Sequence, residues 1–127
     1  MSATAAPNPS ESPLRTLFCI GVTQEFFNAG DEERAAVAAA IPPAFARLAE
    51  RFGVRVLGTL DDDQLMVGAS AAWPWTSYIL ADVPDLDTVS RICGIVRDTE
   101  VGAGGVRLWR YLRIEARAGR PLFFGTE

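Results

Sequence analysis

The order in which two hydrophobic patterns follow each other constrains the fold of this chain most strongly. Four segments alternate with a period of two, at residues 14–25, 54–60, 76–83 and 106–116. Such alternation is typical of strands. Helical spacing occupies residues 31–52 and returns after Pro84-Asp85. The resulting order, β-α-β-β-α-β, predicts an α+β domain in which a four-stranded antiparallel sheet carries both helices on one face.

The first helical segment has its own start, break and stop signals. Acidic residues at 31–33 are favourable at a helix N-terminus, where the backbone dipole is positive. Pro42-Pro43 must kink this helix or divide it, because an interior proline removes a hydrogen bond and clashes with the preceding turn. Gly53 suits the residue just beyond the helix end.

Three further segments are expected to connect these elements. The acidic run at residues 61–63 is typical of a hairpin turn, and residues 64–67 could form a short return strand. Residues 69–75 are expected to be a loop, and residues 98–105 a glycine-rich link that lacks the spacing of a phosphate-binding loop.

Length and charge limit the possible classes of protein. The 127 residues fit one domain, expected at 14–127, after a disordered Ala-, Pro- and Ser-rich leader at 1–13. A net charge of −4 argues against nucleic acid as a partner, and no apolar run approaches the roughly 20 residues of a membrane span. Cys19 and Cys93 lie in apolar runs, so we expect two buried free thiols in a cytoplasmic protein.

The residue types that the chain lacks exclude more kinds of chemistry than its length and net charge do. The chain has no histidine, and all 12 of its basic residues are arginine. Catalytic triads with histidine, histidine metal clusters, lysine Schiff bases and the Walker lysine are therefore excluded. Two separated cysteines do not make a zinc site. We therefore expect no cofactor and no metal, and any catalysis must use carboxylates, arginine, aromatic side chains, hydroxyls or backbone amides.

The C-terminal residues and the order of elements together resemble a known superfamily. The run Arg110-Tyr111-Leu112-Arg113-Ile114-Glu115-Ala116-Arg117, followed by Gly119-Arg120-Pro121-Leu122-Phe123-Phe124, looks like a family signature. In element order, residues 14–124 resemble the ferredoxin-like, dimeric α/β-barrel superfamily. The resemblance implies that two copies pair sheet to sheet as a homodimer, and that the barrel pocket holds a small molecule. The superfamily includes cofactor-free monooxygenases, polyketide cyclases, lactone isomerases and ligand-binding domains, so it does not specify a reaction.

The last predicted strand supplies the main candidates for a site. Its alternation places Trp109, Tyr111, Arg113 and Glu115 on the face away from the helices, where rings beside two charges suit a planar, oxygenated ligand. Burial could raise the pKa of Glu115 and make it an acid–base group, with Arg113 stabilising an oxyanion. The alternative is an ordinary Arg113–Glu115 ion pair at a dimer edge.

Other segments add six candidates, each with an alternative interpretation. Glu25 is expected to end the first strand on the face of Cys19 and Thr23, either as a third catalytic group or as a solvated strand end. The aromatic group Trp73, Trp75 and Tyr78 could close over a pocket and bind substrate, or could fill an interface.

Two function hypotheses from different classes follow. The first is a cofactor-independent cyclase, isomerase or lyase, or a cofactor-free monooxygenase, acting on a small aromatic or polyketide-like metabolite of secondary metabolism or aromatic catabolism. The second is a non-catalytic homodimer that binds such a molecule or serves as an accessory protein. A purely structural homodimer is a third, weaker alternative.

Overall fold

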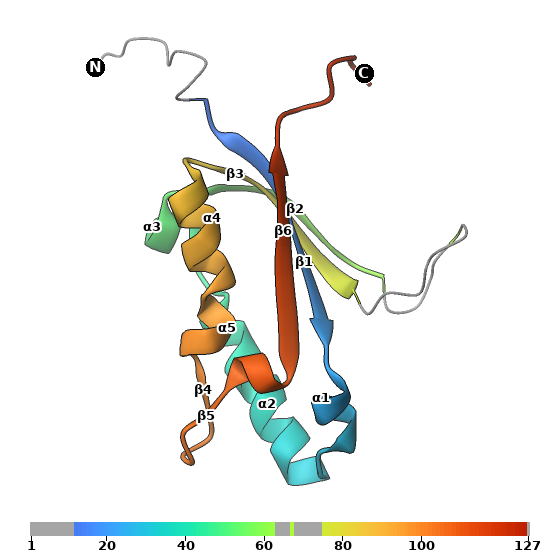
Figure 1. The fold of residues 1–127 in the computed structure, drawn as a ribbon, viewed down its shortest axis with the longest axis vertical. Helices are drawn as coiled ribbons and strands as arrows, with labels where there is room; N and C mark the ends of the chain where they lie inside the picture. Colours follow the sequence, from blue (N-terminus) through green and yellow to red (C-terminus); the bar gives the residue numbers. More distant parts are fainter. Residues whose placement is uncertain (1–11, 63–66, 68–74, 127) are drawn as a thin grey trace.

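The computed structural model of this chain describes residues 12–62, 67 and 75–126. Along these residues the elements are β1 (Leu14–Val22), α1 (Gln24–Asn28), α2 (Asp31–Ala44), α3 (Leu48–Phe52), β2 (Arg55–Asp61), β3 (Trp75–Val83), α4 (Leu86–Cys93), α5 (Ile95–Asp98), β4 (Glu100–Val101), β5 (Val106–Arg107), the 3-10 helix η2 (Leu108–Arg110) and β6 (Leu112–Gly119). Figure 1 shows the helices gathered beside one layer of long strands. No helix in the described ranges is long and apolar enough to cross a membrane.

The long strands form one antiparallel sheet in the order β2-β3-β1-β6. The two central strands pair along most of their length, from Leu14 opposite Val83 to Ile20 opposite Ser77. The last strand joins the other edge of β1, with Val22 opposite Leu112 and Arg15 opposite Gly119. The prediction of an α+β chain with a four-stranded antiparallel sheet is therefore confirmed.

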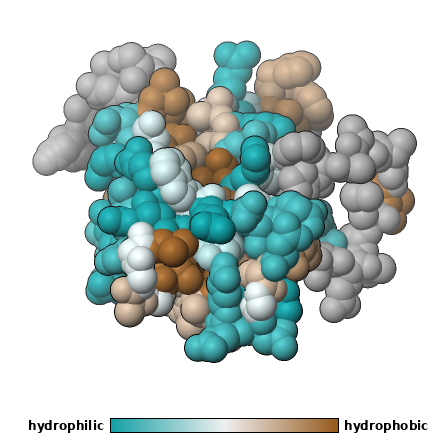
Figure 2. Space-filling view, turned by 60° about the horizontal axis from the view of Figure 1, so that its bottom comes forward, coloured by the Kyte–Doolittle hydropathy of each residue, from teal (hydrophilic) through white to brown (hydrophobic). Residues whose placement is uncertain are grey.

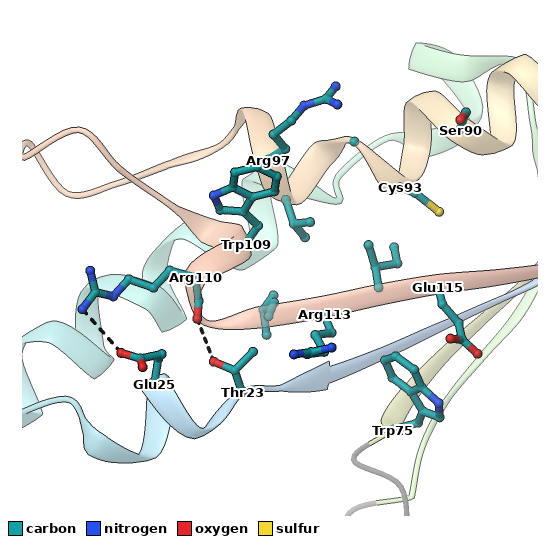
Figure 3. A pocket seen from close by; sticks show the side chains of 14 residues that line it. Thr23, Glu25, Trp75, Ser90, Cys93, Arg97, Trp109, Arg110, Arg113 and Glu115 are labelled. Atoms are coloured by element: carbon teal, nitrogen blue, oxygen red, sulfur yellow. Dashed lines mark hydrogen bonds and ion pairs between the residues drawn. The ribbon is translucent and has the colours of Figure 1, made fainter.

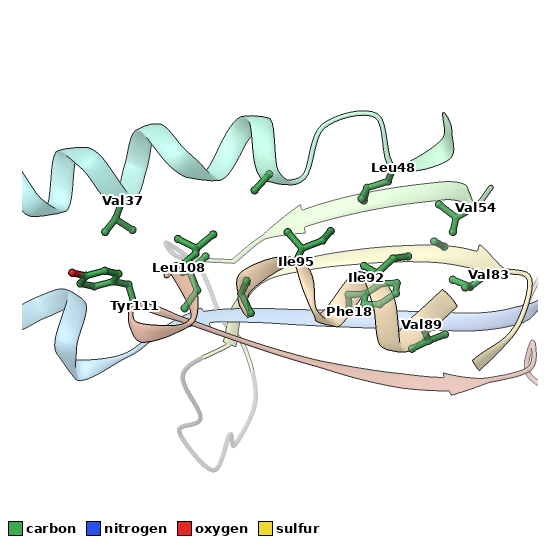
Figure 4. Packing of buried hydrophobic residues seen from close by; sticks show 14 of the residues in the cluster. Phe18, Val37, Leu48, Val54, Val83, Val89, Ile92, Ile95, Leu108 and Tyr111 are labelled. Atoms are coloured by element: carbon green, nitrogen blue, oxygen red, sulfur yellow. The ribbon is translucent and has the colours of Figure 1, made fainter. Parts of the chain in front are cut away.

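One face of this sheet and the helices that cover it enclose the hydrophobic core. Phe18 in the middle of β1, Val37 on α2 and Ile92 on α4 are completely buried. Figure 4 shows these side chains directed into the space between the sheet and the helices. Because residues of β1 alternate between the two faces of the sheet, Thr16 and Phe18 both point toward the helices. Leu17 and Cys19, which flank Phe18, point to the opposite face.

The opposite face of the sheet has an apolar centre with charged borders. Leu17 lies opposite Leu80, and Leu60 lies opposite Tyr78, with Leu60 60% exposed. At one end Arg15 Nε donates to Asp82 Oδ1 at 2.7 Å. Leu17, Leu60, Leu80 and Tyr78 line a hollow of about 480 Å³ on this face.

The end of the molecule that carries α1 and the start of α2 differs from this face. Its surface is mostly hydrophilic, with small separate hydrophobic groups (Figure 2).

The first helical segment is divided, as its two prolines predict. Pro42 and Pro43 lie in the last turn of α2, and Arg47 takes a left-handed conformation (φ 52°) before α3 begins. The guanidinium of Arg51 donates to the carbonyls of Ala44 and Ala46, each at 2.7 Å. These bonds satisfy carbonyls that the end of a helix leaves without a partner. Gly53 ends α3 in the left-handed region, as expected.

The start of α4 depends on Asp85. Its carboxylate accepts hydrogen bonds from the backbone amide and the hydroxyl of Thr88, at 2.8 and 2.7 Å. These bonds hold the pKa of Asp85 below its usual value. The aspartate therefore stabilises the fold above the pKa of an unfolded aspartate, about 4, and this contribution is lost as the pH falls through the lower pKa of the folded state.

Asp85→Ala is expected to lower the thermal unfolding midpoint by roughly 3–6 °C at pH 7, because the helix loses its N-terminal cap. Asp87→Ala is the control, since Asp87 lies in the same first turn but forms only an exposed ion pair with Arg91. Thermal unfolding followed by circular dichroism, at pH 7 and near pH 2, measures both. An equal loss in both variants, or an Asp85 effect that does not become smaller as the pH falls, would contradict this role.

Three sequence predictions about strand alternation are wrong. The first strand ends at Val22, and Glu25 lies in helix α1. A bulge between Val56 and Gly58 reverses the alternation of β2, so Gly58 and Leu60 share the face of Arg55. The predicted strand at 106–116 is divided into a hairpin strand, the turn η2 and β6, because Leu108–Arg110 form one helical turn.

The connecting segments fall partly outside the described residues. Residues 1–11, 63–66 and 68–74 lie outside the described ranges, and with them most of the leader, the return strand at 64–67 and the loop with Trp73. Trp75, which was predicted to end that loop, instead begins β3. The glycine-rich link at 98–105 contains the strand β4, which pairs with β5 as a small hairpin. Gly102 and Gly105 both take positive φ angles in its turn, a conformation that glycine adopts at little cost.

Candidate functional site

A groove of about 610 Å³ follows the edge strand β6, and we call it the β6 groove. Figure 3 shows β6 crossing its middle and dividing its lining into two flanks. Arg113, Glu115 and Trp75 lie on one flank, which belongs to the opposite face of the sheet. The second flank is formed by α4, α5 and η2. The groove is therefore a surface depression that wraps a sheet edge, and it is not an enclosed chamber.

The flank next to the opposite sheet face brings together three predicted site residues. Arg113 and Glu115 are two positions apart on β6, so both point away from the helices, as predicted. Trp75 begins β3 and lies across from Gly21 of β1. A cation, a carboxylate and an indole ring thus line the same flank.

The two charges of this flank do not pair with each other. Glu115 accepts from Arg117, two residues further along the strand. Arg113 makes no hydrogen bond or ion pair within the described part of the chain. The side chain of Glu115 remains 42% exposed, so it lacks the burial that the acid–base hypothesis assumed. The Arg113 guanidinium is therefore available to a ligand, whereas the Glu115 carboxylate already has a partner.

The helical flank contains residues that the sequence did not single out. Ser90 and Cys93 of α4 and Arg97 of α5 line it together with Trp109 of η2. Their positions follow the spacing i, i+3, i+7, which places side chains on one side of a helix, so this signal was present in the sequence. Burial raises the pKa of the Cys93 thiol. The raised pKa favours the protonated thiol over the thiolate.

One end of the groove is closed by contacts between α1 and η2. Arg110 Nη2 lies 3.4 Å from Glu25 Oε2. The Thr23 hydroxyl donates to the carbonyl of Arg110 at 2.7 Å, and the Thr23 amide donates to the carbonyl of Tyr111 at 2.8 Å. Thr23 thus fastens the turn that carries Trp109, and Glu25 is engaged in an exposed ion pair.

The remaining predicted site residues lie elsewhere. Tyr111 is a correction: the turn η2 rotates it away from Arg113, and it is buried in the core with its hydroxyl donating to Glu33. Cys19 is buried on the opposite sheet face and does not line the β6 groove. Tyr78 lies on that face too, where its hydroxyl donates to Asp62 at 2.9 Å. Trp73 is outside the described residues.

Trp109 reaches the groove, but from a position different from the predicted one. It lies on η2, 58% exposed, on the helical flank across β6 from Arg113. Its ring is therefore a wall of the groove and not a neighbour of Arg113 on a common strand face.

The groove has more positive than negative lining groups. Three arginines, Arg97, Arg110 and Arg113, face two glutamates, although the whole chain carries a net charge of −4. The described residues hold no group of three or more cysteine, aspartate or glutamate side chains arranged to bind a metal ion. The arrangement favours a small molecule with a flat apolar body and a negative charge.

Comparison with known proteins gives no independent assignment. The chain matches no protein family model, no curated protein and no solved structure.

Proposed function

We propose that this chain binds a small, planar, negatively charged molecule, of the aromatic or polyketide-like acid class, in the β6 groove. The observation that carries this proposal is the Arg113 guanidinium, which makes no ion pair or hydrogen bond among the described residues and lines the same flank as Trp75, with the exposed Trp109 ring on the other flank. A guanidinium presents two parallel donors to a carboxylate, and an indole ring provides a flat apolar contact.

The assembly that goes with this function is a ferredoxin-like homodimer of the dimeric α/β-barrel kind. The strand order β2-β3-β1-β6 and the helices on one face support the ferredoxin-like part. The apolar centre of the opposite sheet face, formed by Leu17, Leu60, Leu80 and Tyr78, supports a second copy as its cover. In such a dimer, Arg113 and Glu115 would lie at the border of the shared interface.

The binding function is tested with salicylate and its neutral analogue salicylamide. Salicylate is expected to quench tryptophan fluorescence in a saturable way and to bind more tightly than salicylamide. Arg113→Ala should weaken salicylate binding about 10- to 100-fold, because a charge-assisted contact is lost. Arg55→Ala is the matched control, since Arg55 is exposed and does not line the groove.

The same titrations can contradict the proposal. Equal affinity for the acid and the amide would remove the role of charge. Salicylate binding that is unchanged in Arg113→Ala would place the ligand elsewhere, and no binding by a panel of aromatic acids, phenols and polyketides would leave the groove without this function.

A second candidate function is acid–base catalysis without a cofactor, as in a cyclase, isomerase, lyase or cofactor-free monooxygenase. It is favoured by one observation: the Glu115 carboxylate and the Arg113 guanidinium, which has no partner within the part of the chain that the structure describes, lie on the same flank of one groove. Glu115 would remove a proton next to a carbonyl, and Arg113 would stabilise the enolate oxygen that results.

Phenylpyruvate separates the two candidates, since it is an aromatic acid with an exchangeable C–H. A catalyst should accelerate deuterium exchange at its benzylic carbon, measured by NMR, and Glu115→Gln should abolish the acceleration without weakening binding. Exchange at the uncatalysed rate in a wild-type protein that binds phenylpyruvate would leave the binding function alone.

A further inference from the structure

The C-terminal tail after β6 is the most exposed apolar segment of the described chain. Leu122, Phe123 and Phe124 are 64%, 91% and 52% exposed. The two rings contact each other edge to face, with centroids 4.9 Å apart. In Figure 1 the tail leaves the top of β6 and extends beyond the end of the sheet, away from the helices. Two phenylalanines and a leucine in water are unfavourable unless another surface covers them.

The opposite sheet face offers a surface of matching character. Its hollow of about 480 Å³ is lined by Leu17, Leu60, Leu80 and Tyr78, and is predominantly apolar. This volume lies in the range of roughly 300–1,000 Å³ that holds a compact guest. The tail of the same chain does not occupy the hollow, so tail and hollow are two exposed apolar surfaces of one molecule.

The charges beside the two surfaces are complementary. Arg120 precedes the apolar residues of the tail and makes no ion pair among the described residues. Asp62 lines the hollow next to Tyr78. A tail that enters the hollow would bring the Arg120 guanidinium toward this carboxylate.

From these observations we infer that Leu122, Phe123 and Phe124 of one copy dock into the hollow of the opposite sheet face of a second copy. The contact is reciprocal, because each copy provides one tail and one hollow, as a two-fold dimer requires. This inference rests on the homodimer of the proposed function and adds the segment that holds it together. It assigns a role to the tail, whose residues do not line the β6 groove.

The full-length chain tests the inference by sedimentation equilibrium. Phe123→Ser with Phe124→Ser should raise the dimer dissociation constant by about 30-fold or more, as expected when buried aromatic anchors are lost. Phe27→Ser is the matched control, since Phe27 is also exposed (59%) but lies on α1. Leu60→Asp, in the hollow of a partner, should weaken the dimer as strongly as the tail variant.

Mixing the tail variant with Leu60→Asp gives a sharper result. A mixed dimer retains one intact tail and one intact hollow that face each other, so it should form more tightly than either variant alone. A disulfide between Phe123→Cys on one chain and Leu60→Cys on another, differently sized chain would report the contact directly.

Two outcomes overturn the inference, and they are distinguishable. A wild-type dimer that is unaffected by the tail substitutions would remove the tail contact and leave the sheet-to-sheet dimer. A wild-type chain that stays monomeric at the highest concentrations would remove both the dimer and the tail contact. Salicylate binding in the β6 groove is measured separately and is not decided by either result.

Discussion

Phe18→Ala is expected to reduce the free energy of unfolding by about 3–5 kcal/mol. The ring is completely buried in the middle of β1, between the sheet and the helices. Its removal deletes apolar contacts and leaves a cavity that the surrounding elements can fill only in part. Because domains of this kind are stable by about 5–15 kcal/mol, a loss of this size takes a large fraction of the total.

Chemical denaturation followed by circular dichroism measures this loss. Phe27→Ala is the control, because the Phe27 ring is exposed on α1 and its removal should cost less than about 1 kcal/mol. Similar losses in the two variants would mean that β1 does not place Phe18 at the centre of the core.

Tyr111→Ala should reduce the free energy of unfolding by about 3–5 kcal/mol, and Tyr111→Phe by about 1.5 kcal/mol. The first change removes a buried ring, whereas the second removes only the hydroxyl that donates to Glu33. The difference between the two variants separates packing from hydrogen bonding. Losses of equal size would show that the contact with Glu33 dominates, and no loss in either would place Tyr111 outside the core.

The Tyr111 hydroxyl also predicts a pH dependence. The hydrogen bond to Glu33, followed by burial, raises the pKa of Tyr111 above its ordinary value. Its stabilising contribution is therefore complete below the pKa of an unfolded tyrosine, about 10, and is lost as the pH rises through the higher pKa of the folded state. The difference in stability between the wild type and Tyr111→Phe should thus shrink above pH 10, in denaturation series from pH 8 to 11.

The sequence predicted the fold well where one rule governed a whole segment. The alternation around Phe18 fixed which face of β1 meets the helices, and Asp85 marked the start of α4 through its short side chain. The break after Pro42-Pro43 followed from backbone geometry. Where a single residue or turn changed the phase, as at the bulge before Gly58, the alternation rule could not detect it.

The candidate site was predicted in part for the same reason. Arg113 and Glu115 lie inside β6, so counting alternate positions placed them correctly. Trp109 and Tyr111 lie in and directly after η2, where three residues make a turn and alternation no longer applies. Helical spacing places Arg97 on the same side as Ser90 and Cys93, but it does not specify that this side borders β6, which is a tertiary contact.

The position of β6 at the rim of the sheet has a consequence for solubility. A rim strand has backbone groups that can recruit strands from other molecules, the first step of aggregation. Arg113, Glu115 and Arg117 place alternating charges along this rim, which discourages such recruitment. The charges that would recognise a ligand therefore also oppose edge-to-edge pairing. Substitutions that neutralise them to change ligand specificity are expected to lower solubility as well.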